Sequence, residues 1–168
     1  MDPTTVATVF ATVVIVGLVA TIAALFVPTG RELLRSHAPK VVAIAAGGAT
    51  LGSLYFSEVA DYLPCTLCWY QRIAMYPIAL VAVGGLVFRD QGTLRSSLGL
   101  AAIGLAIAVY HIQLQLFPDQ GSSSCEIRNP CTAKWAEAYG FISIPMMAGA
   151  CFAIIVAASV IGLRRPAA

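Results

Sequence analysis

The chain has 168 residues, of which 59% are hydrophobic and 11% are charged, and its net charge is +2. Because soluble domains carry about 25% charged residues, this composition excludes a soluble domain and indicates an integral membrane protein, too short for more than one compact bundle. The small net charge, with no basic run and no glycine-rich phosphate loop, gives no reason to expect a nucleic-acid partner.

Five apolar segments, taken in chain order, are long enough to cross a hydrocarbon core of about 30 Å. They cover residues 4–27, 41–59, 65–88, 97–117 and 141–163. The first has no basic region before it and no clear small-residue cleavage site, so we interpret it as a retained helix and not as a signal peptide. Residues 28–40 are polar and are expected to form a loop. The pattern predicts an all-α membrane protein with a four-helix core and one additional N-terminal transmembrane helix.

Charged residues divide between the two ends of these five spans. The basic residues fall at one end: Arg31, Arg35, Lys40, Arg89, Arg95, Arg164 and Arg165. The opposite end holds Asp2, Glu58, Asp61, Asp119 and Glu126, with Arg128 and Lys134 as its bases. The positive-inside rule then predicts an extracytoplasmic N-terminus and a cytoplasmic C-terminus. Both close-set cysteine pairs would lie on the oxidising side, where disulfides persist.

The first cysteine pair, Cys65 and Cys68, has CxxC spacing and follows Pro64 directly. Proline suits the first turn of a helix, so both cysteines are expected near a helix N-terminus, where the free N–H groups and the macrodipole favour a thiolate. Arg72 lies four residues after Cys68 and therefore on the same helix face. A charge inside the membrane is costly, which makes Arg72 a candidate functional residue.

The second pair, Cys125 and Cys131, lies in the long polar segment 118–140. Two neighbouring pairs can pass a disulfide along by thiolate attack, with the loop pair reaching a soluble partner and the CxxC pair a lipid-soluble acceptor. A quinone is the natural acceptor, because it dissolves in the bilayer and takes two electrons. Arg72 and His111, at similar depths below the outer end of their helices, are the candidate quinone-binding residues.

Each of these residues also has a purely structural interpretation. The cysteines could form static disulfides or a zinc site. Arg72 could extend to the membrane interface, and His111 could be a buried hydrogen-bonding residue. Gln71 and Gln115 are expected to join helices, whereas the lone Cys151 is expected to be a small buried apolar residue.

The segment Cys65-Thr66-Leu67-Cys68-Trp69-Tyr70-Gln71-Arg72 resembles the CxxC-x3-Arg signature of the DsbB family, which includes the BdbC-type proteins. Two further features fit this resemblance, which covers residues 41–163: His111-x3-Gln115-Leu116-Phe117-Pro118, shortly before the loop cysteines, and Pro145 at the start of the last span. The resemblance implies a multi-pass protein of a bacterial-type cell membrane. Residues 41–168 would form its redox domain, and residues 1–40 would add a helix and a cytoplasmic loop.

The resemblance also implies a function. Such an enzyme reoxidises a DsbA-like thioredoxin-fold oxidase and passes the electrons to ubiquinone or menaquinone. Cys68 would be the thiolate at the quinone, with Cys65 as its disulfide partner and a transient partner of Cys131. The partner oxidase would attack Cys125, and Arg72 with His111 would support quinone binding. A quinone reductase resembling vitamin K epoxide reductase is an alternative, but there the CxxC follows the loop cysteines. A non-catalytic membrane module with structural disulfides or zinc is another.

Overall fold

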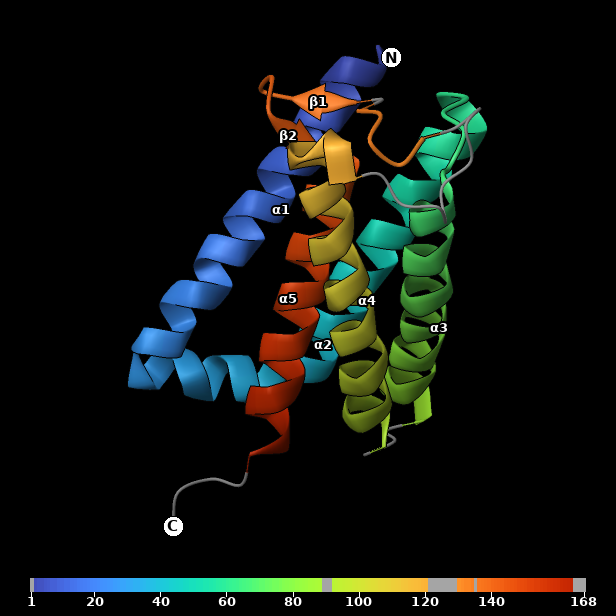
Figure 1. Cartoon of the computed structure of the whole chain (residues 1–168). Helices are drawn as coiled ribbons and strands as arrows, with labels where there is room; N and C mark the ends of the chain where they lie inside the picture. The colour runs from blue at the N-terminus through green and yellow to red at the C-terminus, as the bar shows by residue number, and fades with distance from the viewer. Residues whose placement is uncertain (1, 89–91, 121–129, 135, 165–168) are drawn as a thin grey trace.

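The computed structural model describes residues 2–88, 92–120, 130–134 and 136–164. Within this part of the chain, five helices are long and apolar enough to cross a membrane. They are α1 (Pro3–Phe26), α2 (Pro28–Leu54), α3 (Thr66–Phe88), α4 (Thr93–Leu116) and α5 (Ile144–Leu163). Helices α2 to α5 pack into one bundle, and α1 lies against α2 and α5 (Figure 1). The predicted fold, a four-helix core with one additional N-terminal helix, is confirmed.

Helix α2 begins earlier than the sequence analysis expected. Residues 28–40 are helical and do not form the predicted loop, with Pro28 at the first helical position, where proline costs no hydrogen bond. Pro39 lies inside the helix, where its ring removes a backbone hydrogen bond and favours a change of direction. Figure 1 shows the first turns of α2 running across the lower part of the bundle, behind α5, before the helix rises through it. A π-helical turn, η1 (Tyr55–Val59), continues α2.

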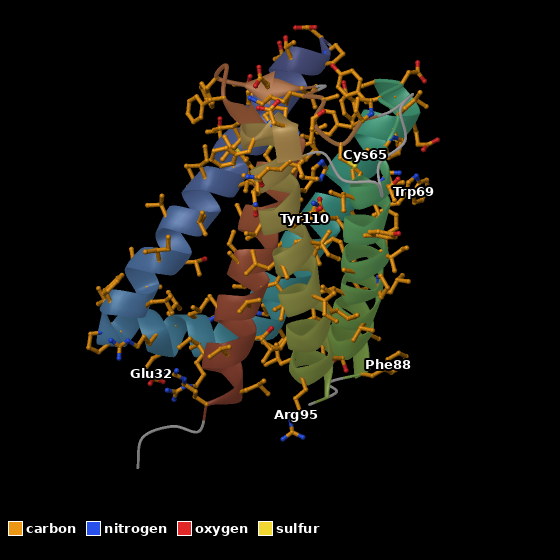
Figure 2. The ribbon with its side chains drawn as sticks, viewed as in Figure 1. Glu32, Cys65, Trp69, Phe88, Arg95 and Tyr110 are labelled. Carbon is orange, nitrogen blue, oxygen red and sulfur yellow. The ribbon has the colours of Figure 1, made fainter. Side chains whose placement is uncertain are left out.

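The two ends of the bundle carry different residues. Figure 2 shows Cys65 and Trp69 towards one end, and Phe88, Arg95 and Glu32 at the other. Glu32 is ion-paired with Arg35 at 3.1 Å on the first turns of α2. The CxxC end is therefore opposite the end that holds Arg35 and Arg95, as the charge pattern predicts. Lys134, which the same pattern placed at the CxxC end, lies beside the cysteines and pairs with Glu137 at 3.2 Å.

Two glycines permit close helix contacts in the bundle. A Cβ atom at Gly104 of α4 would overlap the ring of Phe152, which is fully buried on α5. A Cβ atom at Gly162 of α5 would lie 2.7 Å from Ala38 Cβ and 2.7 Å from Leu94 Cδ1. Such short separations do not occur between real side chains, so α2, α4 and α5 approach one another only because these positions lack a side chain.

Before α5 the chain forms a short 3-10 turn, η2 (Pro118–Gln120), and a small hairpin. Strand β1 (Glu137–Ala138) pairs antiparallel with β2 (Ile142–Ser143), and the turn between them contains Tyr139 and Gly140 at positive φ. The fifth span was expected to begin at residue 141, but residues 142 and 143 belong to the hairpin. Helix α5 therefore starts at Ile144, with Pro145 in its first turn.

Candidate functional site

The CxxC pair lies where η1 ends and α3 begins. Asp61 adopts a left-handed conformation after the π-helical turn, and α3 starts at Thr66, so the predicted helix start beside the cysteines is confirmed. Cys65 immediately precedes the helix, and Cys68 lies in its first turn. Their Sγ atoms are 3.1 Å apart, and the backbone N–H of Cys68 points to Cys65 Sγ at 3.4 Å. The two thiols are unlinked and need little movement to form a disulfide.

His111 of α4 connects this pair to the polar segment. Its Nδ1 lies 3.3 Å from the Gln71 amide nitrogen, and its Nε2 lies 3.0 Å from the Cys131 carbonyl oxygen. Since an amide N–H donates and a carbonyl accepts, these contacts assign the neutral imidazole with its proton on Nε2. The same Nε2 lies 3.7 Å from Cys65 Sγ. The predicted role of Gln71 in joining helices is confirmed, because this contact links α3 to α4.

Cys131 is the loop cysteine that the structure brings to the site. It is 1% exposed and packs with Cys65, Leu67 and Leu114. Cys131 is disulfide-bonded. The other predicted loop cysteine, Cys125, lies outside the described residues.

Gln115 holds the segment after Cys131 against α4. Its amide donates to the Ala133 carbonyl at 3.2 Å, and its carbonyl oxygen accepts from the Ser143 hydroxyl at 2.6 Å. Gln115 was expected to join two helices, but it joins α4 to the loop and to the hairpin. A small space of about 20 Å³ lies between Gln115, His111 and the CxxC pair, which is room for about one water molecule.

The contacts around Cys65 favour negative charge on its sulfur. The hydrogen bond from the Cys68 thiol, and then the one from His111, hold the pKa of the Cys65 thiol well below its ordinary value, although burial opposes this. Because the pKa of Cys65 is lowered in the folded protein, ionisation of Cys65 stabilises the reduced CxxC pair at pH values above that lowered pKa. That stabilisation is lost as the pH falls through the lowered pKa.

This shift predicts a shallow pH dependence for the reduction potential of the CxxC pair. Reduction that yields one thiolate and one thiol takes up one proton per two electrons. The potential should then fall by about 30 mV per pH unit between about pH 6.5 and 8, below the ordinary thiol pKa near 8.5. Thiol trapping in glutathione buffers, with mass spectrometry to assign each cysteine, measures this slope. A slope of about 59 mV, for two protons, would show that Cys65 is protonated.

Cys68 faces a different environment. It borders a cavity of about 490 Å³, whose walls come from α1, α2, α3 and α5 and are mostly apolar. Arg72, one helical turn further along α3, lines the same cavity, as the spacing of four residues predicts. Gln71, Met75 and Tyr76 also reach it. The volume lies within the range of small-molecule sites, and an apolar enclosure with a few polar groups at one end is typical of them.

Arg72 is held in place by α2. Its Nε donates to the Ser53 hydroxyl at 2.9 Å, and its Nη2 donates to the Ser53 carbonyl at 3.0 Å. Its guanidinium carbon lies 5.0 Å from the ring centre of Trp69, and the Tyr76 hydroxyl also bonds to Ser53 at 3.2 Å. Among the described residues, Arg72 forms no ion pair. The guanidinium is therefore held in one orientation, and no carboxylate among the described residues neutralises its charge.

Ser53 is a functional candidate that sequence reasoning missed. It lies among the small residues of α2 and belongs to no motif, so only the packing of α2 against α3 identifies it. Ser53→Ala removes one of the two anchors of Arg72, worth about 1 kcal/mol, and should raise the KM for the ligand of this cavity about five-fold with a smaller change in kcat. Ser36→Ala is the matched control on α2, because Ser36 bonds a carbonyl of its own helix. Equal KM values for Ser53→Ala and Ser36→Ala would exclude this role for Ser53.

The same cluster could hold a metal ion. Ligand atoms of Cys65, Cys68 and His111 all lie within 4.8 Å of one another, which is the one such group among the described residues. A closed structural zinc site needs four ligands, and these residues supply three.

Comparisons with known proteins agree with the resemblance seen in the sequence. The family model described as disulfide bond formation protein DsbB matches residues 35–163. Probable disulfide formation protein C of Halalkalibacterium halodurans is 42% identical over 118 residues, which are 69% of this chain and 85% of the relative. The SPbeta prophage-derived disulfide bond formation protein B of Bacillus subtilis is 43% identical, covering 63% of this chain and 72% of the relative. For probable disulfide formation protein C 1 of Bacillus cereus the identity is 39%, with coverage of 80% and 98%. No solved structure matches significantly.

Proposed function

The chain belongs to the disulfide bond formation protein DsbB family and is a membrane disulfide oxidoreductase, and from this premise we propose that it reoxidises a soluble extracytoplasmic thioredoxin-fold oxidase and delivers the electrons to a membrane quinone. One observation carries the proposal. Cys65 packs against Cys131 of the polar segment, whereas Cys68, one turn away, borders the apolar cavity. The CxxC pair therefore joins a polar side, suited to a protein partner, to an apolar side suited to a lipid-soluble acceptor.

We propose that the disulfide moves through the chain in two exchanges. A partner thiolate attacks the Cys125–Cys131 disulfide at Cys125, and the second partner thiol then closes the partner disulfide. The freed Cys131 thiolate attacks Cys65 of an oxidised CxxC pair, which breaks the Cys65–Cys68 bond and leaves Cys68 as a thiolate. The Cys125 thiolate then attacks Cys131 of the Cys65–Cys131 bond and releases Cys65 as a thiolate, which restores the loop disulfide and leaves the CxxC pair reduced by two electrons. The packing of Cys65 against Cys131 supports this order.

The contacts of Cys65 bear on where the negative charge lies. While both CxxC thiols are reduced, the surrounding hydrogen bonds favour charge on Cys65. Once Cys65 is bonded to Cys131, Cys68 is the sulfur left as a thiolate. Arg72, one turn further along the same face of α3, is the cation that would stabilise it. The thiolate expected at Cys68 thus belongs, in this proposal, to the mixed disulfide and not to the resting dithiol.

The residues around the cavity fit a quinone. Its apolar walls suit a lipid-soluble ring, and the guanidinium of Arg72, which is held by Ser53 and pairs with no carboxylate among the described residues, would bind a ring oxygen. A bound quinone supplies an acceptor for two electrons and two protons. Cys68 would border it directly, whereas His111, fixed by Gln71 and Cys131, faces the Cys65 side. His111 would therefore act on the cysteines and their protons more than on the quinone itself.

Two further proposals concern placement in the membrane. The charge pattern supports an extracytoplasmic N-terminus and CxxC end, with the C-terminus in the cytoplasm. We also propose that residues 41–168 form the redox domain and that residues 1–40 are an addition to it. The family match, which begins at residue 35, supports this division.

The test is oxidation of a reduced, purified thioredoxin-fold protein by the purified chain, with ubiquinone or menaquinone as the acceptor. Quinone absorbance and trapping of the partner thiols should report equal numbers of electrons. Metal analysis of the same preparation addresses the structural alternative. A stoichiometric zinc content without quinone reduction would overturn the proposal in favour of a zinc site at Cys65, Cys68 and His111.

A further inference from the structure

Helix α1 forms part of the cavity that Cys68 and Arg72 border, although it lies outside the region shared with the family. The family match begins at residue 35, and the Bacillus cereus relative is covered over 98% of its length by 80% of this chain. Yet Phe10, Val14 and Gly17 of α1 line the cavity together with residues of α2, α3 and α5. The additional helix is thus part of the candidate site and not only an anchor in the membrane.

The N-terminal half of α1 is fixed to the rest of the protein. Ala7 and Ala11 are fully buried there, and the Thr12 hydroxyl lies 2.7 Å from the Tyr139 hydroxyl of the hairpin. The ring of Phe10 lies 6.2 Å from that of Phe56 in η1.

The C-terminal end of α1 is fixed by the turn into α2. Arg31 Nε donates to the Leu25 carbonyl at 2.7 Å across this turn. A Cβ atom at Gly30 would lie 2.8 Å from the Cα atom of Ala24, so the two helices meet closely. Held at both ends, α1 keeps its middle turns against the cavity.

The polar and apolar groups of the cavity lie on different helices. Cys68, Gln71 and Arg72 are supplied by α3, and Ser53, which anchors Arg72, by α2. The side chains that α1 contributes to the cavity are apolar except that of Thr21, whose hydroxyl already donates to the Gly17 carbonyl at 2.8 Å. A suitable occupant therefore has a polar head at α3 and a long apolar tail along α1.

We infer that α1 binds the isoprenoid tail of the quinone and sets the preference of this protein for tailed over tail-less quinones. The inference rests on the proposed quinone site and adds to it a binding wall, formed by Phe10, Val14 and Gly17. The tail is already dissolved in hydrocarbon before it binds, so its contacts with α1 contribute affinity through close packing and not through removal from water. The head contacts of Cys68 and Arg72 are common to both kinds of quinone.

Gly17 is the position at which to test this wall. A Cβ atom there would lie 3.5 Å from Ile154 Cδ1, an ordinary contact, so Gly17→Ala fits, whereas the larger side chain of Gly17→Leu occupies space along α1. Val16→Leu is the matched control, because Val16 is adjacent on α1, 62% exposed and not part of the cavity wall.

The readout is the dissociation constant of each quinone at constant detergent concentration, from quenching of tryptophan fluorescence, since Trp69 lies beside Arg72. Gly17→Leu should weaken binding of a quinone with a long isoprenoid tail at least about ten-fold, because the leucine side chain occupies the space in which the tail packs along α1. The dissociation constant of the tail-less quinone should change less than about two-fold. Val16→Leu should leave the ratio of the two constants unchanged, and Gly17→Ala, which adds only one methyl group to the wall, should change it less than Gly17→Leu does.

Several results would overturn the inference. They are an unchanged ratio in Gly17→Leu, equal weakening of both quinones, or an equal effect of Val16→Leu. Displacement of the tailed quinone by phosphatidylcholine, with no preference for quinone, would show that α1 holds a structural lipid. If the wild-type protein failed to bind even the tail-less quinone, the proposed function itself would fail. Binding of the tail-less quinone with no gain from a tail would refute only the role of α1.

Discussion

Replacement of Cys68 with serine is expected to lower quinone-linked turnover by at least about 1,000-fold, the scale of losing a residue that forms a covalent intermediate. A hydroxyl cannot form a disulfide, so the electrons on Cys65 have no second sulfur at the cavity. The variant should accumulate reduced partner protein, measured by thiol trapping in the presence of excess quinone. Its Cys65 thiolate can still attack Cys131 of the proposed loop disulfide, which releases Cys125 as a thiolate and traps a Cys65–Cys131 disulfide.

Thr66→Ser is the matched control for this substitution. Thr66 lies in the same first turn of α3 but borders neither the large cavity nor the small space beside His111. The turnover of Thr66→Ser should therefore match that of the wild-type protein. Circular dichroism and gel filtration would verify that both variants fold. If folded Cys68→Ser retained full turnover, Cys68 would not be the sulfur that transfers electrons to the acceptor.

Arg72→Met should produce the second-largest effect, a rise of roughly 10- to 100-fold in the KM for quinone. This range corresponds to the loss of one charged hydrogen bond, worth about 1.5–3 kcal/mol. Methionine has a similar length and stays apolar, so the cavity should keep its shape. Ser53 retains the Tyr76 hydroxyl as a partner at 3.2 Å and is not left unsatisfied. Steady-state kinetics with several quinone concentrations separate KM from kcat.

Arg72→Lys separates the charge of Arg72 from its geometry. Lysine keeps the positive charge but cannot reproduce the two bonds of the guanidinium to Ser53, so its KM should lie between those of Arg72→Met and the wild-type protein. A KM for Arg72→Met equal to that of the wild-type protein would mean that Arg72 has a structural role at the membrane interface.

The sequence predicts most of this fold because bilayer thickness imposes a length on every spanning helix. The start of α3 and the shared face of Cys68 and Arg72 follow from local rules for proline and for helix spacing. The start of α2 was missed because the polar residues 28–40 were read by composition alone. Pro28 at a first helical position, with good helix formers over residues 31–35, was the available signal.

The rest of the site could not be read from the sequence because it depends on contacts between helices. Ser53 meets Arg72 across 19 positions, and Gln71 meets His111 across 40. No local pattern encodes such pairs. The contribution of α1 to the cavity was missed for the same reason, since a uniformly apolar helix does not indicate which of its faces meets protein.

The close glycine contacts of the bundle bear on how α1 is joined to the other helices. Gly104 with Phe152, and Gly162 with Ala38 and Leu94, involve only α2, α4 and α5, within the family-matched residues 35–163. Three of the four core helices therefore pack closely through positions that α1 does not touch. Gly52 of α2, where a Cβ atom would lie 3.2 Å from the Phe10 ring, is by contrast a seat for α1, so replacing the first helix would require a matching change at this position.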